Sequence, residues 1–142
     1  MPIFPSVEWA EALKQVVNSD QEILRVGQDL PTYDSKMVIN PKPGVLEKPF
    51  IMYARPEKGK GIAELALLND VNEREAAYTV QTDYDTMKGI ISGKLDPMKM
   101  VMTGKVRVKG DMKLMMQNVK HQQLFMKALG RVDTQFIDEV KK

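Results

Sequence analysis

Few side chains in this chain could carry out chemistry. His121 is the only histidine among 142 residues and there is no cysteine, which excludes histidine clusters for metal or proton-relay chemistry and any thiolate nucleophile. His121 stands beside Gln122 and Gln123, on what the pattern predicts to be the polar face of a helix, so we expect it to be solvated. Asp83 and Asp85 lie at a predicted helix start, where capping explains them better than paired-carboxylate catalysis.

The cationic side chains of interest fall into two groups. Residues 58–61, Lys-Gly-Lys-Gly, are too short a run for a phosphate-binding loop and are typical of a hairpin connection. Lys105, Arg107 and Lys109 share one face of a predicted strand. This basic row is either an ordinary solvated sheet face or a surface for lipid phosphates, where each cation contributes about 1 kcal/mol near an anionic leaflet. The net charge of only +2 and the absence of a flanking aromatic pair argue against nucleic acid as a partner.

Methionine is concentrated in one part of the chain. Residues 87–126 hold eight of the eleven methionines. The side chain is unbranched and polarisable, so it fills irregular gaps in a core and also adapts to ligands of variable shape. The cluster therefore has two interpretations, an ordinary core that uses methionine or a soft binding cavity.

Two helices are expected to open the chain. Ser6 can cap the first, and Ser19 with Glu22 three residues later has the pattern of a capping box for the second. Prolines then interrupt residues 31–49, and the rest alternates between strand and helix patterns. We expect strands at 36–40, 50–55, 61–68, 76–82 and 102–109, and helices at 84–92, from Pro97 through Met100, from Asp111 to Gly130, and at 134–142.

The strand expected at 102–109 has the clearest two-residue period in the sequence. Met102, Gly104, Val106 and Val108 fall on one face, and the basic row falls on the other. Such alternation is typical of an antiparallel strand with one wet face.

Composition places the chain among ordinary globular proteins. Its length suits one domain, 43% of its residues are hydrophobic, and 28% are charged. No apolar run approaches the roughly 20 residues that span a bilayer. The first residues lack the order of a signal peptide, and the last three do not form a Ser-Lys-Leu address, so we expect a cytoplasmic protein.

One segment resembles a known family. The elements are Ser-Gly-Lys-Leu-Asp-Pro at 92–97, Gly-Lys-Val-Arg-Val-Lys-Gly-Asp-Met at 104–112, and the following helix with Leu114, Met115 and Met116. In this order and spacing they resemble the lipid-binding domain of the sterol carrier protein family, the non-specific lipid-transfer proteins. The resemblance implies an α+β fold with a mostly antiparallel five-stranded sheet and helices packed on one face, enclosing an apolar tunnel.

The resemblance also implies a lipid-binding role for particular residues. The expected domain spans 1–142, with opening helices in 1–30 and the sheet and covering helices in 31–142. The implied lining comprises a helix over the tunnel (Ile90, Ile91, Leu95), a sheet wall (Met102, Val106, Val108), an opposite helical wall (Met112, Met115, Met116, Val119) and a mouth or lid (Phe125, Met126, Leu129).

The function implied is binding of a hydrophobic lipid, followed by its transfer or presentation. The ligand would be a fatty acid, acyl-CoA, sterol or phospholipid, held without catalysis, cofactor or metal. We expect transient contact with a membrane surface, no nucleic acid, and a monomer or a homodimer. A different function class is a dimerisation or accessory module with no lipid role, in which the methionine face packs on a protein. An enzyme acting on bound lipid is a third class, but the stretch from Met98 to Met116 puts no acid or base on its inner face.

Overall fold

The chain folds around one mixed sheet. The computed structural model describes residues 1–28, 33–117 and 119–140, without the side chains of Met112, Leu114 and Met115. The sheet has five strands in the order β4-β3-β2-β5-β6, and only the β2–β5 pair is parallel, which confirms the expected mostly antiparallel sheet. Its strands are β2 (Ser35–Ile39), β3 (Phe50–Glu57), β4 (Gly61–Leu68), β5 (Tyr78–Thr82) and β6 (Arg107–Gly110).

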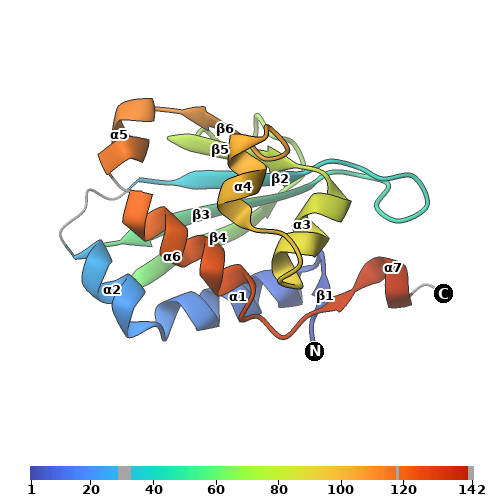
Figure 1. The fold of residues 1–142 in the computed structure, drawn as a ribbon, viewed down its shortest axis with the longest axis horizontal. Helices are drawn as coiled ribbons and strands as arrows, with labels where there is room; N and C mark the ends of the chain where they lie inside the picture. The colour runs from blue at the N-terminus through green and yellow to red at the C-terminus, as the bar shows by residue number, and fades with distance from the viewer. Residues whose placement is uncertain (29–32, 118, 141–142) are drawn as a thin grey trace.

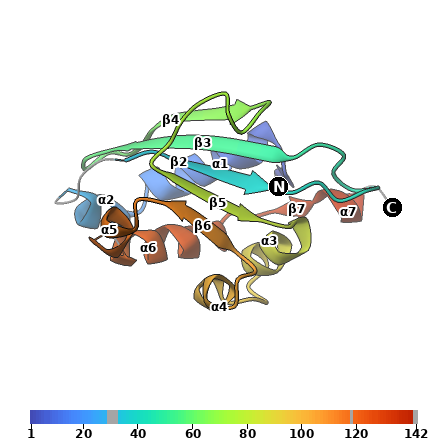
Figure 2. The same cartoon turned by 90° about the horizontal axis from the view of Figure 1, so that it is seen from above.

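The helices gather on one face of this sheet (Figures 1 and 2). A two-stranded parallel pair, β1 with β7, lies near the chain ends. The remaining elements are β1 (Ile3–Phe4), α1 (Val7–Asn18), α2 (Gln21–Gly27), α3 (Tyr84–Ile91), α4 (Pro97–Met102), α5 (Met112–Gln117), α6 (Val119–Leu129), β7 (Gln135–Phe136) and α7 (Ile137–Val140).

Capping side chains define the helix starts, largely as expected. The Ser6 hydroxyl accepts from the Trp9 N–H, and Asp83 accepts from the Thr86 N–H at 2.7 Å. The prediction that Ser19 caps the second helix is wrong. Helix α1 runs to Asn18 and ends at Ser19, so Asp20 takes the capping position of α2 and accepts from the Ile23 N–H at 3.0 Å.

The strand predicted from Met102 onward is also wrong in its first half. Helix α4 continues past Met100 to Met102, where the Thr103 N–H and hydroxyl both donate to the Lys99 carbonyl, and Gly104 then turns the chain at φ +80°. Regular pairing starts only at Arg107. Thus the two-residue period holds for Val106 and Val108, but not for Met102.

The segment expected as one long helix after Asp111 is described as α5 and α6, and residue 118 between them lies outside the described residues. One further boundary differs from expectation. The final helix is expected from residue 134, but Gln135 and Phe136 pair with β1 instead. Among the described residues of this segment, the helix covers Ile137–Val140, because extended pairing with Ile3 and Phe4 occupies the preceding residues. Residues 141 and 142 lie outside the described part.

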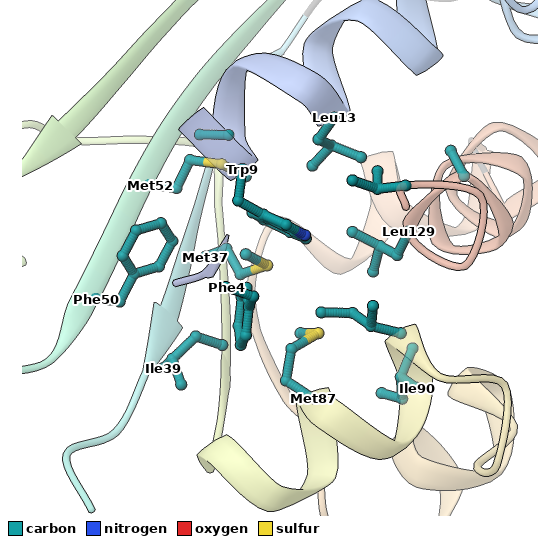
Figure 3. Packing of buried hydrophobic residues seen from close by; sticks show 14 of the residues in the cluster. Phe4, Trp9, Leu13, Met37, Ile39, Phe50, Met52, Met87, Ile90 and Leu129 are labelled. Carbon is teal, nitrogen blue, oxygen red and sulfur yellow. The ribbon is translucent and has the colours of Figure 1, made fainter. Parts of the chain in front are cut away.

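An aromatic cluster fills the core at the start of α1. Trp9 and Phe4 lie edge to face with ring centres 4.7 Å apart, and Phe4 also contacts Phe50 and Phe136. Figure 3 shows the Trp9, Phe4 and Phe50 rings between α1 and the sheet, with Met87 and Leu129 nearby. The N-terminal helices are therefore part of the main core, which also includes residues of α3 and α6.

A smaller cluster covers the opposite face of the sheet. It is made by Val38, Ile51, Tyr53 and Leu68 under the β4–β5 loop. The Lys36 ammonium donates to the carbonyl oxygens of residues 71 and 74 in that loop, at 2.7 and 2.8 Å. The loop covers only the β2–β3–β4 part of this face, since Arg107 and Lys109 of β6 remain exposed on it. An apolar hollow lies instead between the sheet and the helices.

Candidate ligand cavity

A cavity of about 300 Å³ lies between the sheet and the helices. Its floor is a row of four side chains in register across adjacent strands. Met52 on β3 faces Met37 on β2, Met37 faces Val80 on β5, and Val80 faces Val108 on β6. Since alternate residues of a strand share a face, this row is fixed by the strand pairing. Two methionines give the floor an adaptable shape.

The walls come from the helices α1 to α6. The lining side chains of these helices are apolar, and they come from both the N-terminal and the C-terminal half of the chain. The lining side chains are Val17 (α1), Ile23 and Leu24 (α2), Met87 (α3), Met98 and Val101 (α4), Met116 (α5), and Val119, Phe125, Met126 and Leu129 (α6).

Three of these lining side chains also reach solvent. Met116 is 76% exposed, Val119 is 42% exposed and Met98 is 38% exposed, although all three line the cavity. The cavity is thus bordered by exposed apolar side chains of α4, α5 and the start of α6. Exposed apolar groups around a hollow are typical of a ligand or membrane contact.

Polar side chains gather where α6 begins. His121 and Gln122 line the cavity there, together with Tyr33 just before β2. The His121 ring packs against Gly27 of α2, where an added Cβ would stand 3.5 Å from Nε2. The prediction of a solvated histidine is therefore wrong: its side chain is half-buried between two helices.

Burial shifts the titration of both ionisable groups in this cluster. It lowers the pKa of His121 below 6.5, because desolvation disfavours the imidazolium. It raises the pKa of Tyr33 above 10.0, and the Gln122 side chain offsets this rise in part. Both groups are neutral at physiological pH.

The residues expected to bind lipid lie in three different settings. Ile90 and Ile91 are buried in the core without lining the cavity, and Leu95 packs over Gly89 of α3. Met102 is 83% exposed at the end of α4, so its expected place on the sheet wall is wrong. The side chains of Met112 and Met115 lie outside the described part of the structure.

The expected residues that line the cavity are Val106, Val108, Met116, Val119, Phe125, Met126 and Leu129.

Sequence reasoning missed the contribution of the first half of the chain. Ile23 and Leu24 reach the cavity from α2, and Met37 and Met52 form half of its floor. The alternation of Met37 with Ile39 was a usable signal, because both side chains lie on the helix-covered face.

The described residues contain neither a cluster of metal ligands nor a membrane span. Within that part of the chain, no three His, Asp or Glu side chains are grouped so that they could hold a metal ion. No helix there has both the length and the apolar character needed to cross a bilayer.

The fold and the cavity define a class of α+β domains in which helices cover one face of a five-stranded sheet and leave an apolar hollow between the layers. Residues 46–123, more than half of the chain, match the sequence profile described as the SCP-2 sterol transfer family. The chain therefore belongs to this family.

Solved structures share the fold at low sequence identity. A crystal structure of sterol carrier protein 2 is 18% identical with a TM-score of 0.76, and the alignment covers 89% of this chain and 97% of that one. A conserved hypothetical protein from Thermus thermophilus, possibly a sterol carrier protein, is 18% identical with a TM-score of 0.75, over 92% of this chain and 90% of that one. Palmitated SCP2L2 from Aedes aegypti is 17% identical with a TM-score of 0.54, over 81% and 92%. No curated protein matches the sequence significantly.

Proposed function

We propose that this protein binds one hydrophobic lipid in the cavity and transfers it or presents it to a partner. The observation that carries the proposal is the apolar hollow between sheet and helices in a member of this family. The ligand would be a fatty acid, an acyl-CoA, a sterol or a phospholipid. The palmitate carried by the Aedes aegypti protein supports an acyl ligand.

The binding mechanism needs no catalytic group. Removing a methylene from water is worth roughly 0.8 kcal/mol, so a long acyl chain gains on the order of 10 kcal/mol from an apolar cavity. A bilayer offers the same chain nearly the same gain. The protein-bound and membrane-bound states are then close in free energy, which suits exchange. Methionines on the floor and walls favour tolerance of different chains.

We further propose that residues 1–142 work as one domain. The opening helices 1–30 supply Val17, Ile23 and Leu24 to the cavity and Trp9 to the core. Asn18 fastens the end of α1 to β4, because its side-chain amide donates to the Ile62 carbonyl at 3.1 Å and accepts from the Ile62 N–H at 2.7 Å. Removing this segment would open the cavity as well as the core.

Lipid binding is tested most cleanly by a matched pair of substitutions on α6. Met126 lines the cavity, whereas its neighbour Lys127 is exposed. Met126→Trp places a bulky ring in the hollow, and Lys127→Trp adds the same ring on the outside. With delipidated protein and a fluorescent acyl probe, we expect saturable binding that Met126→Trp weakens at least tenfold and Lys127→Trp leaves unchanged. Folded wild-type protein that shows no saturable binding would refute the proposal.

Exchange would occur while the α4–α5 side contacts an anionic membrane surface. Met98 and Met102 lie one turn apart on α4 and are both exposed. Residues 94–113 carry six Lys or Arg against two Asp, a local charge of +4 in a chain whose net charge is +2. Lys94, Lys99 and Lys105 are exposed in the same stretch of chain as Met98 and Met102, and cations close to exposed apolar side chains fit an anionic leaflet.

Vesicle sedimentation tests this contact. We expect binding to phosphatidylserine-containing vesicles, weakening with salt, and loss of binding in Met102→Glu. Met1→Glu, which changes an exposed methionine outside this region, is the control. Equal binding to neutral vesicles, or equal loss in both variants, would contradict the assigned surface.

A further inference from the structure

The apolar cavity has a polar end whose hydrogen-bonding groups are not used by the fold. The Tyr33 hydroxyl is buried and has no hydrogen-bond partner within the described chain. Among the described residues, neither nitrogen of the His121 imidazole has a hydrogen-bond partner either. The Gln122 amide lies beside Tyr33 in the same wall. Burying a polar group without a hydrogen-bond partner costs free energy, so a ligand that supplies the missing partner stabilises the complex.

The His121 ring packs against α2 at Gly27. A Cβ added at Gly27 would stand 3.5 Å from Nε2, an ordinary van der Waals contact. Leu24 and Ile23 of the same helix line the cavity next to it. The ring is thus held at the boundary between the apolar hollow and its polar end.

Few charged side chains lie at the polar end of the cavity. The cavity wall supplied by α2 contains no titratable side chain, and Tyr33 is neutral. The β3–β4 hairpin contributes Glu57 and Lys58, which are exposed and of opposite charge, and Glu57 also faces Lys60 at 3.6 Å. Burial lowers the pKa of His121 with no carboxylate to counter it, so the imidazole is neutral at pH 7.5. Lys36 also lines the cavity, but its ammonium donates to two carbonyl oxygens of the β4–β5 loop. The other lysine of the lining, Lys58, is exposed on the hairpin, so a charged head group buried beside His121 would have no buried counter-charge.

We propose that the cavity selects an amphiphile whose polar end is an uncharged oxygen, a hydroxyl or a carbonyl, and that His121 forms a hydrogen bond to it beside Gln122 and Tyr33. This inference rests on the proposed lipid-binding function and adds the chemistry of the head group. The apolar remainder of the ligand extends along the floor toward Met87 and Val106.

Two ligands with the same chain separate the head-group chemistry. Binding of hexadecan-1-ol and hexadecanoate is measured at pH 7.5 with delipidated wild type, His121→Phe, His121→Gln and the control Gln123→Ala, whose side chain is exposed on the same helix. We expect the alcohol to bind more tightly than the acid. His121→Phe should weaken alcohol binding about five- to tenfold, His121→Gln should recover most of it, and Gln123→Ala should change nothing.

The unique histidine also provides a direct readout. Nitrogen-15 NMR of the imidazole should show a perturbed His121 in the alcohol complex whose pKa remains below 6.5. Tighter binding of the acid than of the alcohol would overturn the inference in favour of a charged head group, if the pKa of His121 rose above 6.5 or if Lys58→Met weakened binding of the acid. Equal binding of the alcohol to wild type and His121→Phe would overturn it as well. Failure of both ligands to bind would overturn the lipid-binding function itself, a result distinguishable from the other two.

Discussion

At the scale of single residues, position relative to distant parts of the chain decides what a side chain does. His121 looks solvated in the sequence because Gln122 and Gln123 follow it. Its ring is nevertheless half-buried, because it packs against α2 at Gly27, nearly a hundred positions earlier in the chain. No local pattern encodes such a contact between two helices.

The buried imidazole predicts a pH dependence of stability. Its folded-state pKa lies below 6.5, so the unfolded chain binds a proton first as the pH falls. Native stability should therefore decrease as the pH drops from about 7.5 through the 6.5 region, and His121→Phe should remove that decrease. Urea unfolding of both proteins at two pH values measures the difference. An identical pH slope in the two proteins would show that the imidazole is not desolvated.

A second residue-scale prediction concerns Asp138, which accepts from the Tyr84 hydroxyl at 2.6 Å and from the Lys88 ammonium at 2.8 Å. Burial alone would raise its pKa, but the hydrogen bonds from Lys88 and Tyr84 together hold the pKa below 3.8. Its contribution to stability is therefore present above pH 3.8 and lost as the pH falls through the lower folded-state value.

Asp138→Asn should cost about 1–2 kcal/mol of unfolding free energy at neutral pH. Glu139→Gln, at a more exposed carboxylate 3.3 Å from the same lysine, is the control and should cost less. The difference between wild type and Asp138→Asn should shrink in acid. A cost that stays constant down to about pH 2.5 would contradict the pKa assignment.

At the scale of elements, the Ser-Gly-Lys-Leu-Asp-Pro segment joins α3 to α4 through a tight turn. Gly93 has φ +80° and ends α3, and the N–H groups of Lys94 and Leu95 then donate to the Gly89 carbonyl at 2.8 and 3.0 Å. Leu95 folds over Gly89, where an added Cβ would lie 2.5 Å from Cδ1. The motif thus places α4 against the end of α3, and α4 in turn borders the cavity.

The edge strand β6 depends on a glycine in a similar way. At Gly110 φ is +143° and a Cβ would lie 2.2 Å from the Ala77 carbonyl oxygen. At Gly104 φ is +80° and a Cβ would meet nothing within 4 Å. Gly110→Ala should cost on the order of 2–4 kcal/mol, whereas Gly104→Ala should cost only about 1 kcal/mol. Equal costs in thermal or urea unfolding would show that β6 does not approach β5 so closely.

Elements were predicted well where one local signal dominated. Asp83, Asp96 and Pro97 mark helix starts in any context, and β4 has its predicted bounds because glycine and a charged loop separate it from β3. Prediction failed where two signals overlapped. Met102 fits both the end of a helix and the start of an alternating strand, and the chain turns out of the helix only at Thr103 and Gly104.

At the scale of the molecule, the cavity is built from segments that no single stretch of sequence identifies as a site. The family-like region supplied Val106, Val108 and part of α6, which were predicted as lining residues. The strand register that brings Met37 and Met52 beside them depends on the order of the whole sheet. The pairing of this half of the floor with Val80 and Val108 therefore became visible only in three dimensions.

A ligand that binds only the folded state must stabilise it. At a free concentration one hundred times its Kd, a lipid adds about 2.7 kcal/mol to the unfolding free energy. Thermal unfolding with hexadecan-1-ol should show this increase in wild type and Lys127→Trp, and a much smaller one in Met126→Trp. Equal increases in all three would place the ligand elsewhere on the protein.

The central claim is that the cavity holds one lipid, and native mass spectrometry of protein purified without detergent tests it most directly. We predict a complex of one chain with one lipid, which identifies the ligand by its mass, in wild type and Lys127→Trp. Met126→Trp should be recovered without it. Ligand-free wild-type protein that also fails to take up added lipid, or a Met126→Trp variant that retains the same lipid, would contradict the account.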